Sequence, residues 1–449
     1  MKPTKIRPRV ARQILSALEG GVVPKQGIQH LLVGRAAETE EILSILEQVE
    51  DGASEVRIWV GDFGTGKSFM LRTIQQLALM KNFACTTADL TPTRRFQASD
   101  GKALALYREL IKRLQTQGAE EGQALPAILL RYLKTRSGKL PAFSGLSLDR
   151  GEEWMQLDSS MVQDLRREIF RDFSQFQSGG LAFEFSQALV GYLEALVENL
   201  PQKQFQILRW LGGLMETKTE AKKELQIHRI INDDTWTDAL QNWAELLRRA
   251  GYAGLVANFD ELVNLYKLAR AQSREQNYER ILNLYNDCKG GNVQGLFLNF
   301  AATRKAVYDE RRGMSSYGAL KGRFGLASEN LQELADQRST VQQLKPLSPE
   351  EIYTLLEKLQ ELYRTVYPFD PAFSPQEIAR FMQAQLNRPG AEEFLTPRSV
   401  IKDFIDLLQL AEQNPDKEPK DILQSRFGRL GVMTRDAQDH DDDLSIEIL

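Results

Sequence analysis

The chain has 449 residues, of which 42% are hydrophobic and 26% are charged, and its formal net charge is −4 at pH 7. This length suits two or three domains, and the composition is ordinary for a globular protein with a sizeable core. So small a net charge excludes a protein that is basic over its whole surface, although a local basic face is compatible with it.

Cysteine and histidine usage narrows the class of protein further. The two cysteines, Cys85 and Cys288, are far apart, which indicates a reducing compartment and not a disulfide framework. The three histidines are isolated, so the usual zinc-binding clusters are excluded. No apolar run approaches about 18 residues, and no apolar signal core precedes residue 30. We therefore expect a soluble cytoplasmic protein that does not enter a membrane.

The first predicted element is a basic amphipathic helix over residues 7–19, which stops at Gly20-Gly21. We assign residues 1–30 to this helix and to the arm that follows it. A second amphipathic helix, with apolar residues at helical spacing between positions 42 and 49, leads into the first strand.

The stretch from Gly61 to Ser68 matches G-x-x-x-x-G-K-[ST], the phosphate-binding loop (P-loop) of nucleoside triphosphatases. Residues 55–60 before it predict a buried strand, and residues 69–80 after it predict an amphipathic helix. A glycine turn that happens to precede a helix is the alternative, and the flanking strand and helix argue against it. The predicted nucleotide-binding residues are Gly61, Asp62, Phe63, Gly64, Thr65, Gly66, Lys67, Ser68 and Phe69.

The residue types in this loop suit a phosphate ligand. Glycines let backbone N–H groups close around the phosphates, and the following helix N-terminus adds partial positive charge. Lys67 would reach the β- and γ-phosphates, and the Ser68 hydroxyl would ligate Mg²⁺. We therefore expect ATP and Mg²⁺ as cofactors.

A second strand is predicted at residues 83–90, and a long, mostly helical segment follows over residues 94–250. This segment is too long for an ordinary connection between strands, so we interpret it as a helical insertion in a nucleotide-binding core at residues 31–345. Trp236 and Trp243 lie at helical spacing within it, and core packing is the favoured interpretation of both.

An apolar stretch over residues 253–259 runs into Asp260-Glu261, the Walker B pattern. Asp260 would hold the Mg²⁺ water shell, and Glu261 would polarise the attacking water. The alternative is a strand followed by an acidic helix start, where carboxylates are favoured in any case. A further strand is predicted at residues 293–302, and the last one at residues 341–344.

Three helices with explicit start signals are predicted after this strand, within residues 346–412. Each has a hydroxyl N-cap followed by proline: Ser348-Pro349, Ser374-Pro375 and Thr396-Pro397. The first two add glutamate three residues on, the capping-box pattern. Residues 413–449 are assigned to a helix and a disordered acidic tail.

Arg398 falls in the first turn of the third helix, where a cation opposes the helix dipole. This unfavourable position suggests that Arg398 faces a phosphate. The alternative is a solvated surface arginine.

Three segments in order carry a family resemblance: Leu18 to Pro24, Val33-Gly34-Arg35, and Val60 to Phe69. They resemble a bacterial family of AAA+ ATP-binding proteins that belong to BREX-type phage-defence systems, over roughly residues 7–410. The resemblance implies an ORC/Cdc6-like α/β fold: a P-loop AAA+ core of three α/β/α layers with a parallel sheet, a large helical insertion and a C-terminal helical lid. It also implies that Val33, Gly34 and Arg35 wrap the adenine and ribose.

The same resemblance implies further site residues. Thr303 is the preferred sensor 1 residue, at the end of the strand beside Walker B, with Asn299 as the alternative. Arg323 matches the arginine finger that acts on a neighbouring subunit's ATP, and Arg398 matches the sensor 2 arginine. Asn258 departs from the pattern, because it is polar within an otherwise apolar Walker B strand.

We therefore expect an AAA+ ATPase that hydrolyses ATP with Mg²⁺ to remodel or load a multi-protein defence complex associated with DNA. Its expected partners are other subunits of that complex, further copies of the chain when ATP is bound, and DNA. The alternative is a non-hydrolysing, nucleotide-gated DNA-binding or scaffold module. Small-molecule phosphoryl transfer is poorly supported, because such kinases are usually compact.

The insertion contains the basic stretches that would bind DNA. They are Arg94-Arg95, Arg131 to Lys139, Arg166-Arg167 and Lys218 to Lys223. Solvated helix faces and contacts to protein are the alternatives.

Overall fold

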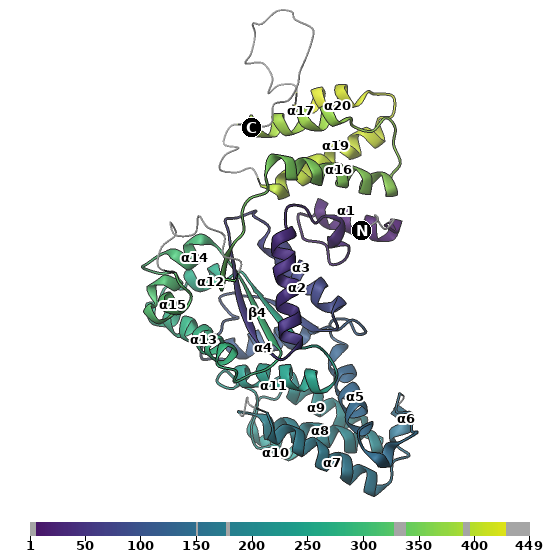
Figure 1. Cartoon of the computed structure of the whole chain (residues 1–449), viewed down its shortest axis with the longest axis vertical. Coiled ribbons are helices and arrows are strands. Elements are labelled where there is room, and N and C mark those ends of the chain that lie inside the picture. The colour runs from purple at the N-terminus through teal and green to yellow at the C-terminus, as the bar shows by residue number, and fades with distance from the viewer. Residues whose placement is uncertain (1–5, 150, 177–179, 327–337, 389–395, 428–449) are drawn as a thin grey trace, which may run out of the picture. The chain divides into compact units, whose positions relative to one another are not determined.

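The computed structural model describes residues 6–149, 151–176, 180–326, 338–388 and 396–427. The chain forms two compact units (Figure 1). The larger unit spans Arg35–Pro346, and the smaller unit combines the residues before Arg35 with those after Pro346. The tail at residues 428–449, which the sequence predicts to be disordered, lies outside the described residues.

A five-stranded parallel sheet forms the centre of the larger unit. Its strands are β1 (Glu55–Val60), β2 (Ala84–Asp89), β3 (Leu255–Asp260), β4 (Leu296–Ala302) and β5 (Val341–Gln343). They lie side by side in the order β2-β3-β4-β1-β5, and every neighbouring pair is parallel. The carboxyl ends of all five strands therefore meet at one edge, which confirms the predicted α/β class with a parallel sheet.

Helices cover both faces of the sheet, which gives the three expected layers. On one face, α2 (Ala36–Glu50) and α3 (Lys67–Met80) pack on Trp59, Val256 and Phe297. On the other face, α4 (Lys102–Lys112), α11 (Trp236–Arg249) and α13 (Ala271–Lys289) belong to the core that contains Ile58 and Phe259. The strands are apolar on both faces because both faces are buried.

The connection from β2 to β3 is helical, as the sequence predicts. Besides α4 and α11 it holds α5 (Ala124–Ser137), α6 (Gly151–Trp154), α7 (Ser159–Ser174), α8 (Ala182–Val197), α9 (Pro201–Leu211) and α10 (Lys218–Leu225). Figure 1 shows α7 to α10 clustered on the far side of α11 from the sheet. Trp236 and Trp243 are fully buried in the common core, which confirms their packing role.

Four shorter elements connect the later strands. They are α12 (Val263–Tyr266) after β3, then α14 (Arg304–Tyr308), a 3₁₀ turn at Met314–Ser316 and α15 (Gly318–Arg323) after β4. Two further 3₁₀ turns lie at Ile28–His30 and Pro141–Phe143.

The smaller unit is helical. It consists of α1 (Pro8–Glu19), α16 (Pro349–Val366), α17 (Pro375–Leu386), α19 (Pro397–Gln413) and α20 (Pro419–Phe427). Capping boxes open α16 at Ser348 and α17 at Ser374 as predicted, and Thr396 with Ser399 forms a third one that the sequence analysis did not anticipate. No described helix is both long enough and apolar enough to cross a membrane.

The N-terminal helix α1 packs against α16 and α19, near the other end of the chain. Its apolar stripe, Ala11, Ile14 and Leu15, is buried. The side chain of Gln409 on α19 donates a hydrogen bond to Glu19 over 2.7 Å. The first helix of the sequence is therefore part of the same unit as the C-terminal helices.

Candidate nucleotide-binding site

The P-loop connects β1 to α3 at the carboxyl edge of the sheet. Gly64 and Gly66 have φ angles of 86° and 89°, in the left-handed region that favours glycine. Gly66 is the N-cap of α3, and no described side chain caps that helix. The first N–H groups of α3 are therefore available to an anion, and the helix dipole favours negative charge at the same place.

Lys67, the first residue of α3, turns its ammonium group back into the loop. Its Nζ donates hydrogen bonds to the carbonyl oxygens of Gly61 at 2.9 Å and Asp62 at 2.6 Å. Burial lowers the pKa of the Lys67 ammonium, and the carboxylates of Asp260, Glu261 and Asp62 oppose that shift. The loop thus holds a desolvated cation, for which an incoming phosphate is a better partner than neutral carbonyl groups.

Helix α3 and strand β3 meet directly. The Ser68 hydroxyl donates a hydrogen bond to Asp260 Oδ2 over 2.6 Å. Glu261 follows with an exposed side chain, a φ of 61°, and an N–H that donates to Asp260 Oδ1 at 2.7 Å. A left-handed backbone is strained for glutamate, and such strain concentrates at functional sites.

The oxygen atoms of Ser68 and Asp260 suit a hard divalent cation. Mg²⁺ prefers oxygen ligands and is bound in phosphate sites by one or two protein groups, with water and phosphate oxygens completing the shell. Among the described residues there is no group of three or more His, Cys, Asp and Glu side chains that would form an all-protein metal site. The donor set therefore fits a cation held jointly with a nucleotide.

Arg35 forms hydrogen bonds that hold the P-loop in place. Its guanidinium is buried, donates to the carbonyl oxygens of Thr65 at 3.1 Å and Lys345 at 2.7 Å, and pairs with Glu38 at 3.2 Å. These bonds tie the loop to the segment that follows β5. The family resemblance implies that Arg35 contacts the nucleotide, whereas its guanidinium donates to backbone carbonyl groups in the structure.

The other proposed nucleotide contacts lie in varied surroundings. Gly34 has a φ of 66°, in the left-handed region that favours glycine, and it lies beside the Glu351 carboxylate. Val33 precedes it in the smaller unit and is partly buried. Phe63, at the loop's tip, is 72% exposed, and the Lys67 ammonium lies 5.6 Å from the centre of its ring.

The two candidates for sensor 1 differ in position, because Asn299 lies within β4 and Thr303 follows it. Thr303 directly follows β4 at the carboxyl edge of the sheet, and its hydroxyl accepts the Ala306 N–H at 3.3 Å as the N-cap of α14. Asn299 is fully buried in the middle of the strand and accepts a hydrogen bond from Trp59 Nε1 at 3.1 Å. Thr303 is thus the candidate at the edge that carries Asp260.

The two proposed arginines are exposed. Arg323 ends α15, and its Nη1 donates to Asn286 Oδ1 of α13 at 2.8 Å. Arg398 is the second residue of α19, as predicted, and its aliphatic stem lies beside Gly21 within the smaller unit. The P-loop and Walker B residues converge at one edge of the sheet, whereas Arg323 and Arg398 present their side chains to the surroundings.

Most of the basic residues proposed for DNA contact have partners in the structure. Ion pairs join Arg94 to Glu109, Lys134 to Asp149, Arg136 to Asp172, Arg166 to Glu194, Arg167 to Asp164 and Lys223 to Glu224. Arg131 donates to the carbonyl oxygens of Ala250 at 3.0 Å and Gly251 at 2.6 Å. The insertion's positive charge is therefore largely balanced locally, which favours the interpretation of solvated or protein-facing helix surfaces.

A family model described as "BREX system ATP-binding protein BrxC/D" matches residues 6–426, which is nearly the whole chain. The chain belongs to this family. The resemblance drawn from the N-terminal segments and the P-loop is thereby confirmed, together with an ATP-binding role in BREX phage defence. A search of curated proteins gives no match. Membership of a BREX system also implies that this protein works among the subunits of a multi-protein defence complex.

Two structural features of the site could not be predicted from the sequence. One is the role of Arg35 in holding the loop, because one of its partners is the Lys345 carbonyl group, which follows the distant strand β5. The other is a set of buried polar contacts made by Asn258, Asn299 and Trp59 inside the sheet. The signal for the second was present, because two asparagines occur within apolar strands, but it does not reveal which groups they contact.

Proposed function

We propose that this BREX ATP-binding protein hydrolyses ATP with Mg²⁺ in the cytoplasm, and that hydrolysis drives remodelling or loading of a DNA-associated defence complex. The observation that carries the proposal is the junction of Ser68, Asp260 and Glu261 beside the P-loop. A protein that only binds ATP does not require an exposed carboxylate in a strained backbone directly after the cation-binding aspartate.

The proposed roles of the site residues follow from their positions. The N–H groups of the loop and the Lys67 ammonium bind the phosphates, and Arg35 keeps the loop in the conformation that does so. Mg²⁺, when bound, would be held by Ser68 and Asp260 and would neutralise charge on the phosphates. Glu261 orients and polarises the attacking water.

The remaining assignments extend the proposal to an assembly. Thr303 contacts the γ-phosphate as sensor 1, and Val33 and Gly34 lie against the adenine and ribose. Arg323 is exposed and acts on the ATP of a neighbouring copy of the chain, so that the active form is a homo-oligomer. Arg398 contacts a phosphate from the lid as sensor 2. The roles of Thr303, Arg323 and Arg398 share one physical basis, which is that positive or hydrogen-bonding groups stabilise charge on the transferred phosphoryl group.

Glu261→Gln tests the proposal directly. The variant keeps the size of the side chain and the loop, so ATP affinity measured by calorimetry should be unchanged. Turnover should fall by about 100-fold or more, because the water loses its base. Glu275→Gln, which removes an exposed carboxylate from α13, is the matched control and should hydrolyse ATP normally.

Two outcomes would contradict the proposal. Turnover of Glu261→Gln at the unmutated rate would show that the Walker B assignment is wrong. Tight ATP binding by the unmutated protein with no turnover, alone or with duplex DNA, would favour the non-hydrolysing, nucleotide-gated module instead.

A further inference from the structure

One row of polar side chains crosses the sheet on the face that α2 and α3 cover. Backbone register places Thr87 of β2 opposite Asn258 of β3, Asn258 opposite Asn299 of β4, and Asn299 opposite Arg57 of β1. Residues in register on adjacent parallel strands point to the same face, and the strands lie about 4.8 Å apart. Both asparagines are fully buried, although their other neighbours on this face are apolar.

The two asparagines bind groups on either side of the P-loop. Asn258 Nδ2 donates a hydrogen bond to the Leu71 carbonyl oxygen in the first turns of α3, at 3.0 Å. Asn299 Oδ1 accepts a hydrogen bond from Trp59 Nε1, at 3.1 Å, on the strand that leads into the loop. The loop's two flanking elements are therefore each fastened to the strands that carry Asp260 and Thr303.

Two side-chain hydrogen bonds join α3 to β3, one after the other along the helix. Ser68 and Leu71 lie three residues apart on one side of the helix, and Asp260 and Asn258 lie two residues apart on one face of the strand. The first hydrogen bond, between Ser68 and Asp260, lies at the site, and the second, between Asn258 and Leu71, lies in the core. Both bonds join the same helix to the same strand.

Complementary atoms remain unpaired at the centre of the row. Asn258 Oδ1, an acceptor, and Asn299 Nδ2, a donor, are both buried without a hydrogen-bond partner among the described residues. Burying unpaired polar atoms is costly, so two such atoms at neighbouring register positions call for a functional explanation. Each asparagine therefore uses one end of its amide for a bond to an element beside the loop and leaves the other end unpaired.

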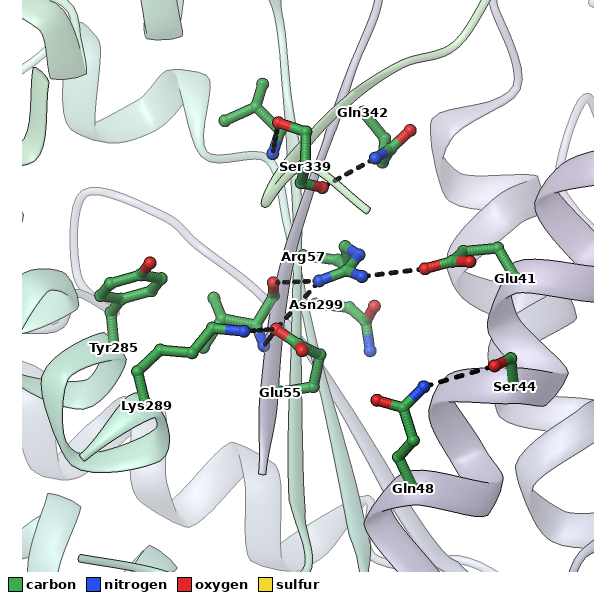
Figure 2. A network of polar contacts seen from close by, with 12 residues as sticks. Glu41, Ser44, Gln48, Glu55, Arg57, Tyr285, Lys289, Asn299, Ser339 and Gln342 are labelled. Carbon is green, nitrogen blue, oxygen red and sulfur yellow. Dashed lines mark hydrogen bonds and ion pairs between the residues drawn. The ribbon is translucent and has the colours of Figure 1, made fainter. Parts of the chain in front are cut away.

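Ion pairs anchor the end of the row on β1. Figure 2 shows the buried Arg57 between Glu41 of α2 and Glu55, with Asn299 beside it. Arg57 pairs with Glu41 at 3.0 Å and Glu55 at 2.9 Å, and Glu55 also pairs with Lys289 of α13. This end of the row is therefore held to helices on both sides of the sheet.

We propose that Asn258 and Asn299 are positioning residues for the cation site of the ATPase. Asn258 holds α3 at the distance from β3 at which Ser68 and Asp260 bind one cation together, and Asn299 holds β1, the strand that leads into the loop, through Trp59. The inference rests on the proposed function, because it assumes that ATP binds with Mg²⁺ at these two side chains. It predicts that the asparagines act on the Mg²⁺-dependent part of ATP binding and not on phosphate binding by the loop itself.

Calorimetric titration of the full-length protein with ATP, in EDTA and in Mg²⁺, tests this. Asn258→Leu removes the amide at nearly constant size and should keep the ATP affinity in EDTA. The gain in ATP affinity that Mg²⁺ provides should become about tenfold smaller, which corresponds to one hydrogen bond in a dry site. Asn299→Leu should act in the same direction, and Asn258→Ser, whose hydroxyl is too short to reach Leu71, provides the same test in a less drastic variant.

Thr87→Val is the matched control, because it removes a buried polar atom from the same row on β2, a strand that flanks neither end of the loop. It should leave the Mg²⁺-dependent gain unchanged. Equal losses in EDTA and in Mg²⁺, or an unchanged gain in both asparagine variants, would overturn the inference. An unmutated protein that binds ATP equally well with and without Mg²⁺ would instead overturn the proposed function on which it rests.

Discussion

Replacing Arg35 by methionine separates support of the P-loop from contact with the nucleotide. Methionine fills a similar apolar volume but removes the charge and every donor. The structure assigns Arg35 two hydrogen bonds to backbone carbonyl groups, Thr65 in the loop and Lys345 after β5, and one ion pair with Glu38. The substitution therefore releases the loop from the rest of the core without altering any loop residue.

The expected magnitude follows from these contacts. Hydrogen bonds from a charged group contribute about 1.5–3 kcal/mol each, so the two bonds contribute about 3–6 kcal/mol before the cost of burying the guanidinium is subtracted. With that cost, we expect a loss of about 2–3 kcal/mol in the free energy of unfolding. If about half of this loss falls on the order of the loop, the dissociation constant for ATP rises about tenfold.

Calorimetric titration with ATP and a denaturant unfolding curve measure the two effects. Arg131→Met is the matched control, since Arg131 also donates to two backbone carbonyl groups but does so before the start of β3, at the opposite edge of the sheet. It should lower stability and leave ATP affinity unchanged.

Arg35→Lys then distinguishes the two roles. The guanidinium divides its contacts between Nη2, which donates to both carbonyl oxygens, and Nη1, which pairs with Glu38. An ammonium group has one nitrogen and cannot make all of these contacts together, so a supporting role predicts a loss close to that of methionine, whereas a charge contact to the nucleotide predicts that lysine substitutes well. Unchanged ATP affinity in Arg35→Met would refute the supporting role.

Three further predictions concern assembly, protonation and DNA. Turnover per subunit should rise with protein concentration and should collapse in Arg323→Ala. Mixing that variant with Glu261→Gln should restore activity if the two defects lie on opposite sides of one interface. A rate that changes neither with protein concentration nor in Arg323→Ala would indicate a solitary enzyme. Because burial lowers the pKa of Lys67 and bound phosphate favours its protonated form, ATP affinity should fall as pH rises through that lowered pKa, with proton uptake on binding that calorimetry in two buffers detects; a flat profile up to about pH 10 would contradict it. Since the basic side chains of residues 94–250 are largely paired, the full-length protein should bind duplex DNA weakly, with affinity that drops steeply between about 50 and 200 mM salt in a fluorescence titration. Binding that is tight and insensitive to salt would show that this expectation is wrong.

The nucleotide-binding segment was predictable because its signals are contiguous. The strand at Glu55–Val60 has the bounds expected from its β-branched and aromatic residues, and α3 begins at Lys67 within the motif. Proline and hydroxyl caps likewise located the starts of α16, α17 and α19, since a cap acts on backbone groups within three residues. The family model that matches residues 6–426 supports an ATP-binding role for the chain.

What the tertiary structure decided depends on residues far apart in the chain. Arg35 has the sequence context of a nucleotide contact, yet β5 and the loop provide carbonyl oxygens that bury its charge. Asn258 departs from the apolar pattern of its strand, and its partner is the Leu71 carbonyl group of α3, which only the folded structure brings next to it. The role of a buried polar side chain can be inferred only when its partner is known. An unpaired buried polar group destabilises the fold, whereas a hydrogen-bonded one can hold two elements together. The sequence by itself thus determined the local elements and the chemistry of the loop, and the packing of distant segments decided what its buried polar residues do.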